Sequence, residues 1–484
     1  MIGVITGTIF IVIVTRRLDP ADFGLWTLIG SLISYVTIIE PIVTYWTTRQ
    51  IARGEKVGKT AISTSGLFSI VGLGIYIIIA FFISQTLGSD LNILLLASFL
   101  IPISFMNNIL NSICAGFRPQ SIPYGILSFE LTKIPVGFLF VIIFPLGIIG
   151  VLIATIVANA VRMTLLLIHA RSQLLVSFKR QYVKFWVRMS WLTLYTSIHG
   201  FIYKLDVLIF SLVTGSLVGL AFWGVASAAS NFVGYSGTIS QGLFPKILAT
   251  GKSEYAKENL KKSMYFAVPL VGLSVVFAKP ALHVLNPLYI DGVYIVGIMA
   301  IRLLVNVITG FYFSVLESYE RVDLDKQASF KQFLHSRIFT IPTLWLIYSI
   351  IYIASLSIFL FLIWTPQMLD SETVMIWALI LLAVNIPFMI YGLIKAKKNH
   401  NIDFPFKDTA KYVGVTMLAV IIVHLLSENT LTYPPSIWDF IPEVVPLVFL
   451  GVSIYFGISY IIDKTTRKLF RTIFDELIKH RKNP

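Results

Sequence analysis

Residues 61–86 read AISTSGLFSIVGLGIYIIIAFFISQT, a run of 26 residues without a charged side chain. A helix rises about 1.5 Å per residue, so about 20 apolar residues cross the roughly 30 Å hydrocarbon layer of a bilayer. Strands of membrane β-barrels are shorter, about ten residues, and alternate apolar with polar side chains, which this run does not do. The stretch therefore predicts a transmembrane helix.

Similar apolar blocks recur on both sides of this stretch. The chain has 484 residues, of which 56% are hydrophobic and 13% are charged, whereas a soluble domain carries roughly a quarter charged residues. We predict an all-α polytopic membrane protein with about fourteen spans, at 1–15, 22–46, 61–86, 93–114, 124–144, 148–170, 190–212, 220–244, 264–286, 293–317, 338–364, 373–394, 412–426 and 441–462. The connections are too short to hold a nucleotide-binding or catalytic domain.

The basic residues predict the orientation of these spans. Of 38 Lys and Arg residues, 31 lie in alternate connections and in the tail, at 47–60, 115–123, 171–189, 245–263, 318–337, 395–411 and 463–484. Positive residues in short loops stay in the cytoplasm during insertion. We therefore expect a cytoplasmic-membrane protein with both termini in the cytoplasm. The net charge of +14 then reflects topology, and no nucleic-acid partner is expected.

The start of the chain does not have the pattern of a signal peptide. The first predicted span has only about 14 apolar residues and lacks the charged region and cleavage site of a signal peptide, so we expect part of this span to be missing. The single cysteine, Cys114, excludes an internal disulfide. No Cys or His cluster has the spacing of zinc ligands, so we expect no metal site and no cofactor.

Seven ionisable side chains lie well inside the predicted spans: Glu40, Glu130, Lys133, Arg162, Lys204, Asp206 and Arg302. Each would cost about 2.5–3.5 kcal/mol if it faced lipid at the centre of a helix. We therefore expect these side chains to face one another or a water-filled cavity. A cavity would indicate transport.

Three of the cations are candidates for a phosphate site. Lys133 and Arg162 lie in adjacent predicted spans at a similar depth, about 12–14 Å from the cytoplasmic ends at 1.5 Å per residue. Arg302, in the outer half of its span, is either a further phosphate contact or a partner of Asp206. The alternative is that Glu130, three residues before Lys133, neutralises Lys133, while Arg162 extends its charge towards the interface.

The seventh predicted span carries a polar stripe. At 100° per residue, Tyr195, His199, Tyr203 and Asp206 fall within an arc of about 80°, and Lys204 points away from them. Asp206 therefore needs a partner from another helix or a hydrated lumen. His199 is either a proton-coupling site, because its pKa lies near neutral pH, or a packing residue.

Two motifs resemble catalytic or nucleotide-binding sites, but each also fits an ordinary structural element. GEKVGKT at 54–60 resembles a phosphate-binding loop, but it has one residue too few between the glycines and joins two predicted spans. Asp19 and Asp22 resemble the acidic pair of membrane glycosyltransferases. They also fit a helix start, with Asp19 as N-cap, Pro20 at the first position and Asp22 in the first turn.

Several stretches resemble one family. RRLDPADFGLW at 16–26 is similar to the "ARLLGPEEFGLY" junction of the polysaccharide-type lipid flippases, which belong to the multidrug/oligosaccharidyl-lipid/polysaccharide exporter superfamily. KLDVLI at 204–209 with VGLAFW at 218–223 is similar to that family's "RIDRLLLG…VGIY", FPK at 244–246 to its "LFPRL", and LGIIGV at 146–151 to the start of its sixth span. FGL at 23–25 and VGL at 218–220 also occupy matching places in two halves, as in repeat-built transporters.

The resemblance implies two pseudo-symmetric six-helix lobes that open alternately to either side. We predict an N-lobe at 1–170, a cytoplasmic linker at 171–189, a C-lobe at 190–394, and two further spans with a basic tail at 395–484. The predicted function is a flippase for polyprenyl-phosphate- or pyrophosphate-linked oligosaccharide, with lipid-linked oligosaccharide, the bilayer and a coupling H⁺ or Na⁺ as partners. The alternatives are a cation-coupled drug antiporter, which would use Asp206, Glu40 and Glu130, and a membrane glycosyltransferase or polymerase that uses Asp19 and Asp22.

Overall fold

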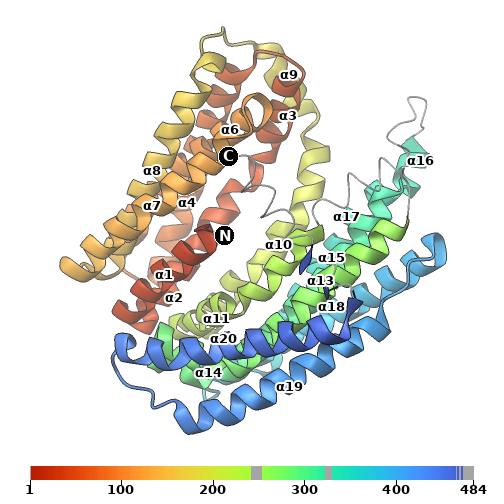
Figure 1. The fold of residues 1–484 in the computed structure, drawn as a ribbon. Coiled ribbons are helices and arrows are strands. Elements are labelled where there is room, and N and C mark those ends of the chain that lie inside the picture. Colours follow the sequence, from red (N-terminus) through yellow and green to blue (C-terminus); the bar gives the residue numbers. More distant parts are fainter. Residues whose placement is uncertain are drawn as a thin grey trace, which may run out of the picture. The chain divides into compact units, whose positions relative to one another are not determined.

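A computed structural model describes residues 2–240, 253–320, 322, 330–464, 466–467 and 470–471. All secondary structure in these residues is helical, and every predicted span overlaps one to three consecutive helical elements (Figure 1). Twelve helices are long and apolar enough to cross a membrane, or thirteen if one bent pair counts as a span. The predicted fold class is confirmed: the chain is an all-helical, multi-pass membrane protein.

The N-terminal half of the chain, up to residue 240, contains these elements: α1 (Ile2–Arg17), α2 (Pro20–Val36), η1 (Thr37–Ile39), α3 (Pro41–Ala52), α4 (Gly58–Leu87), α5 (Leu91–Ala97), α6 (Leu100–Phe117), α7 (Ser121–Gly137), η2 (Phe138–Ile143), α8 (Gly147–Leu174), α9 (Arg180–Arg188), α10 (Ser190–Thr214), α11 (Leu217–Ser230) and η3 (Asn231–Ser240). From residue 253 onwards they are α13 (Ser253–Val276), α14 (Ala278–Leu285), η4 (Pro287–Gly292), α15 (Val293–Ser318), α16 (Phe330–His335), α17 (Arg337–Ile358), η6 (Phe359–Ile363), α18 (Asp370–His400), α19 (Phe406–Thr430) and α20 (Ile437–Ile462).

The predicted spans differ from these helices at both ends of the chain. The helix of the first predicted span, α1, has 16 residues, fewer than the 18 that a candidate span needs, so it is not among the twelve or thirteen candidate spans of the described residues. The predicted span 412–426 was too short, because α19 has 25 residues and includes the polar residues on either side of its apolar centre. The predicted motif at 244–246 and the end of the tail at 472–484 lie outside the described residues.

The chain divides into two compact units. The first comprises residues 1–228 and 339–380, and the second comprises residues 229–338 and 381–484. The first unit therefore contains the six N-terminal spans together with α10, most of α11, α17 and the start of α18. The second contains α13 to α15, most of α18, and α19 and α20. The two-lobe organisation remains a prediction.

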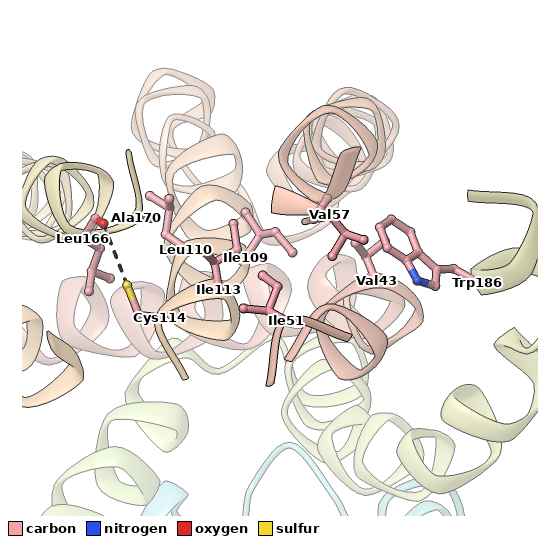
Figure 2. Packing of buried hydrophobic residues seen from close by; sticks show 11 residues of the cluster. Val43, Ile51, Val57, Ile109, Leu110, Ile113, Cys114, Leu166, Ala170 and Trp186 are labelled. Atoms are coloured by element: carbon pink, nitrogen blue, oxygen red, sulfur yellow. Dashed lines mark hydrogen bonds between the residues drawn. The ribbon is translucent and has the colours of Figure 1, made fainter. Parts of the chain in front are cut away.

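The first unit has a core of small and branched apolar side chains where α3, α4, α6 and α8 meet (Figure 2). In this core the Cys114 thiol lies 3.8 Å from the carbonyl oxygen of Leu166, with which it forms a weak hydrogen bond. Trp186 of α9 is fully buried in the same cluster, and its indole Nε1 donates a 3.1 Å hydrogen bond to Gln50. The segment between residues 171 and 189 is therefore anchored to the N-terminal helices by Trp186.

A close approach of two helix starts explains one of the sequence motifs. A Cβ atom at Gly24 would collide with the backbone carbonyl of Leu217 at the start of α11. Only glycine lets two backbones come this near, because it has no side chain. The FGL motif at 23–25 is thus a packing feature that brings α2 against α11 within the first unit.

The outward side chains in the middle of α4 are apolar. On α4, Leu67 is 61% exposed, Ile70 67% and Ile78 72%. A contiguous apolar face of this kind is rare on a soluble monomer. It is the surface that hydrocarbon would cover.

The second unit is built around a bent helix pair. Helices α13 and α14 meet at an angle of 66°, and Phe277 at the bend packs with Val423 of α19 and with Phe440 of α20. Lys261 of α13 adds ion pairs of 3.2 Å to Asp408 and 3.7 Å to Asp463. The two C-terminal helices are thus integral parts of this unit.

Candidate functional site

Lys133 and Glu130 form a buried ion pair on α7. The Lys133 ammonium lies 3.0 Å from Glu130 Oε2, and both side chains are about 11% exposed. The ammonium also lies 5.0 Å and 4.7 Å from the ring centres of Phe10 and Phe129, within the range of cation–π attraction. The pairing that the i, i+3 spacing offered as an alternative is therefore present, and the charge of Lys133 is largely compensated.

Arg162 lies on α8, which packs along α7. Its side chain is half-buried, and it makes no ion pair within the described part of the chain. Its Nε is a buried donor for which the described residues provide no hydrogen-bond acceptor. An uncompensated buried donor on a cation costs free energy until an acceptor is supplied. Arg162 is therefore the better anion-binding candidate of the two cations on α7 and α8.

Asp206 belongs to a buried hydrogen-bond chain. Tyr352 Oη donates a 2.7 Å bond to Asp206 Oδ2, and Trp377 Nε1 donates a 2.6 Å bond to Tyr352 Oη. Asp206 is 4% exposed, and Tyr352 and Trp377 are fully buried. The sequence predicts that Asp206 needs either a partner on another helix or a hydrated lumen. The structure provides the partner on another helix. That partner is a hydroxyl group.

The rest of the polar stripe on α10 also packs against α17. Tyr195 stacks on Phe339 with ring centres 5.0 Å apart, and its hydroxyl hydrogen-bonds to Thr343. One turn further, His199 stacks on Trp345 at 6.1 Å. The stripe is therefore an aromatic seam between two helices, as the packing interpretation of His199 predicts. Lys204 is exposed on a different side of α10.

Sequence reasoning missed Tyr352 and Trp377. They lie 146 and 171 residues from Asp206, on α17 and α18, and no local spacing links them to α10. The available signal was that a tyrosine or tryptophan buried in a span needs a hydrogen-bond partner.

Glu40 lies at a break in the second span. Helix α2 ends at Val36, a 3-10 turn follows, and α3 begins at Pro41. The side chain is 7% exposed, and Asn108 of α6 donates a hydrogen bond to its Oε2. Its Oε1 has no hydrogen-bond partner among the described residues. Glu40 lines an open cavity of about 340 Å³ on the first unit.

Arg302 lies on α15 of the second unit and is half-buried. Lys133, Arg162, Glu40 and Asp206 all belong to the first unit. A shared cavity that includes Arg302 therefore remains a prediction.

The motif at 54–60 and the pair Asp19 and Asp22 lie in the structural elements that their simpler interpretations predict, a turn and a helix start. Residues 53–57 form a non-helical turn between α3 and α4, with Gly54 in the left-handed region at φ +87°. Helix α2 begins at Pro20, with Asp19 in extended backbone before it, although the Asp19 side chain makes no capping hydrogen bond. Among the described residues, no three His, Cys, Asp or Glu side chains are grouped to hold a metal ion.

Comparison with known proteins identifies the fold. No protein-family model and no curated protein matches the chain. The solved structure of the lipid II flippase MurJ in an inward closed conformation matches with a TM-score of 0.66 and 15% identity, over 97% of this chain and 98% of that one.

Drug transporters match less completely. An inward-facing multidrug resistance MATE family transporter of the MOP superfamily matches with a TM-score of 0.56 and 12% identity, over 82% of this chain and 96% of that one. A point mutant of the Vibrio cholerae MATE transporter VcmN matches with a TM-score of 0.54 and 15% identity, over 83% of this chain and 95% of that one. The chain therefore has the fold shared by the flippase MurJ and the MATE transporters.

Proposed function

We propose that this protein is a flippase for polyprenyl-phosphate- or pyrophosphate-linked oligosaccharide in the cytoplasmic membrane, with both termini in the cytoplasm. The headgroup would cross through a cavity that opens alternately to either side, while the lipid tail stays in the bilayer. No covalent chemistry is needed. Cationic side chains of the protein would bind the phosphate, and water in the cavity would solvate the sugar.

One observation carries this proposal. The match with the lipid II flippase extends over 97% of this chain, whereas the matches with the two drug transporters extend over 82% and 83%. The difference is similar in length to the part of the chain that holds α19 and α20. These helices are packed firmly onto α13 and α14 by Phe277, Val423 and Phe440. The end-to-end likeness favours a lipid-linked substrate over a small soluble one.

Arg162 is the residue of the first unit that we propose as the phosphate contact. Its guanidinium is half-buried, makes no ion pair within the described part of the chain, and has a buried Nε donor in need of an acceptor. Phosphate oxygens are strong acceptors for guanidinium donors. Lys133 would contribute less, because Glu130 lies 3.0 Å from its ammonium. Arg302 is the corresponding candidate in the second unit.

The test compares two arginines on one helix. Arg162→Ala removes the proposed contact, and Arg171→Ala removes an exposed arginine near the end of α8. In proteoliposomes with fluorescent lipid-linked oligosaccharide, Arg162→Ala should lose tenfold or more of the flipping rate, since a hydrogen bond to a charged group contributes about 1.5–3 kcal/mol. Arg171→Ala should keep the wild-type rate. Equal rates for both variants would remove Arg162 from the site.

A cation-coupled exporter of small cationic compounds is the second candidate. It is favoured by the fold shared with the MATE transporters and by the buried carboxylate of Glu40 in a cavity. Such an exporter would raise the resistance of a sensitised host to cationic drugs. The proposed flippase would leave that resistance unchanged.

A further inference from the structure

The bend between α13 and α14 opens a pocket in the second unit. Pro280, in the first turn of α14, has no backbone N–H, so the carbonyl of Val276 loses its helical donor. The helical bonds on either side persist, from the Phe277 N–H to the Leu273 carbonyl at 2.9 Å and from the Ala281 N–H to the Phe277 carbonyl at 2.8 Å. A missing donor of this kind is a usual cause of a sharp kink, and the two helices meet at 66°.

Helix α19 lies along α13 and closes the pocket on the other side. The Lys261–Asp408 ion pair of 3.2 Å joins the starts of these two helices. Val275 and Val420 line the pocket nearer their ends, so the helices run in the same direction. The pocket has a volume of about 790 Å³, within the range of roughly 300–1,000 Å³ that small-ligand sites occupy.

The lining of the pocket changes from apolar to polar in the same direction along both walls. On one wall, Val275 and Val276 of α13 are followed by Lys279 of α14. On the other wall, the apolar Val420 and Ile421 of α19 are followed by three polar residues, His424, Ser427 and Glu428. These three lie within the last two turns of α19, which ends at Thr430. A span ends where a bilayer has its polar headgroups, so the polar part of the pocket lies at headgroup level.

Lys279 is a cation without a carboxylate partner. It makes no ion pair within the described part of the chain, and its ammonium lies 4.7 Å from the centre of the Tyr433 ring, which lines the same pocket. In the two connections at this end of the unit, 277–292 and 427–440, Lys279 is the one Lys or Arg residue. The positive charge of the pocket is therefore concentrated at a single side chain.

The wall beside this ammonium is held in place. Tyr433 has a φ of +52°, which is uncommon for a bulky residue and persists only where the surroundings fix it. His283 of α14 and Phe440 of α20 flank the Tyr433 ring, each with ring centres 5.2 Å from it. His283 Nε2 also lies 2.9 Å from the carbonyl oxygen of Pro434. The ring that contacts Lys279 is thus positioned before any ligand arrives, which lowers the cost of binding.

Glu428 places a carboxylate in the same pocket. Its Oε1 lies 3.4 Å from Nε2 of His424, and both side chains are more than half exposed. An imidazole balances a carboxylate only when it is protonated. The polar part of the pocket therefore presents one ammonium, from α14, and one carboxylate, from α19.

From these observations we infer that the pocket between α13, α14 and α19 binds one phospholipid of the phosphatidylethanolamine type, with its phosphate on Lys279 and its amine on Glu428. Phosphate oxygens accept charge-assisted hydrogen bonds from an ammonium group, and a primary ammonium donates them to a carboxylate. A headgroup that is only anionic would leave Glu428 without a counter-charge, and a choline headgroup has no N–H donor. The acyl chains would lie against the apolar wall. Binding does not rest on the proposed transport function; only the identity of the leaflet rests on the proposed orientation.

The test is native mass spectrometry of the purified full-length protein in detergent, with added phosphatidylethanolamine, phosphatidylglycerol or phosphatidylcholine of identical acyl chains. Wild-type protein should bind one phosphatidylethanolamine with a Kd at least about tenfold lower than for the other two lipids. Lys279→Gln removes the ammonium and should raise that Kd by about tenfold. Lys407→Gln makes the same change at an exposed lysine near the start of α19 and should bind like wild type.

A pair of tryptophan variants tests the apolar wall. Ile421→Trp fills part of the pocket, whereas Leu426→Trp adds the same ring at an exposed position of α19 that does not line it. A lipid that binds only the folded protein raises its thermal midpoint. Phosphatidylethanolamine should raise the midpoint of wild type and of Leu426→Trp, and it should leave the midpoint of Ile421→Trp unchanged.

The headgroup assignment has its own variant. Glu428→Gln should remove the preference for phosphatidylethanolamine over phosphatidylglycerol. Equal affinity of the wild type for all three lipids would indicate an unspecific lipid belt and overturn the site, as would undiminished binding in Lys279→Gln or Ile421→Trp. A wild-type preference for phosphatidylglycerol would overturn the zwitterionic ligand. If phosphatidylethanolamine binds as expected and no lipid-linked oligosaccharide is flipped, the proposed function fails and the site stands.

Discussion

The hydroxyl of Tyr352 donates a 2.7 Å hydrogen bond to the carboxylate of Asp206, and both side chains are buried within the first unit. The bond joins α10 to α17 across 146 residues of sequence. Trp377 completes the chain by donating to the same hydroxyl and by stacking on Trp223 at 3.8 Å. The Asp206 carboxylate thus accepts a hydrogen bond from α17, and the donor hydroxyl of that bond is itself held by a donor from α18.

This bond predicts the effect of Tyr352→Phe. The substitution removes the donor and leaves Asp206 without that hydrogen bond in a buried setting, which costs about 1–3 kcal/mol. Thermal unfolding in detergent should show a midpoint several degrees lower than wild type. Tyr124→Phe, the same change at an exposed tyrosine of α7, should have no effect. Equal midpoints for both variants would show that Asp206 does not depend on Tyr352.

The glycine contact between α2 and α11 gives a prediction with a control on the same helix. Gly24→Ala places a methyl group against the Leu217 carbonyl, and overpacking of this kind costs about 1–3 kcal/mol. Gly30→Ala adds the same methyl group where no atom lies within 4 Å, so it should be neutral or slightly stabilising through helix propensity. Expression level and thermal midpoint are the measurements. A Gly24→Ala protein as stable as Gly30→Ala would contradict the close approach.

The Lys133–Glu130 pair predicts non-additive mutations. Glu130→Gln alone leaves a buried ammonium without its carboxylate, and breaking a buried pair in this way costs about 3–5 kcal/mol. Adding Lys133→Met to Glu130→Gln removes the orphaned charge and should restore most of the stability. The yield of folded protein after size-exclusion chromatography measures both effects. Additive losses in the double variant would mean that the two side chains act independently.

The sequence was sufficient for features that depend on nearby residues. The apolar run at 61–86 predicted α4, and the i, i+3 spacing of Glu130 and Lys133 predicted their pairing as one of two alternatives. The helical arc of Tyr195, His199 and Asp206 correctly placed these side chains on one face of α10. Helix periodicity and span length are local properties, so a single sequence carries them.

Features that depend on distant residues could not be predicted. No spacing shows that Asp206 meets Tyr352, because the contact exists only after α10 packs against α17. The polar cavity beside Glu40 could have been predicted only in part. The polar positions from Ser34 to Thr44 are visible in the sequence, but the wall that Asn108 and Asn111 provide depends on how α6 packs against the break at Pro41.

The most direct test of the central claim is the flipping rate of fluorescent polyprenyl-pyrophosphate-linked oligosaccharide in proteoliposomes that contain the wild-type protein. Flipping is measured as the fraction of the label that a membrane-impermeant quencher reaches over time. Protein-free vesicles give the baseline. The proposed function predicts that the protein moves the labelled lipid across the bilayer well above this baseline and that unlabelled lipid-linked oligosaccharide competes. A rate equal to the baseline, in vesicles where the same protein exports a small cationic dye, would contradict it.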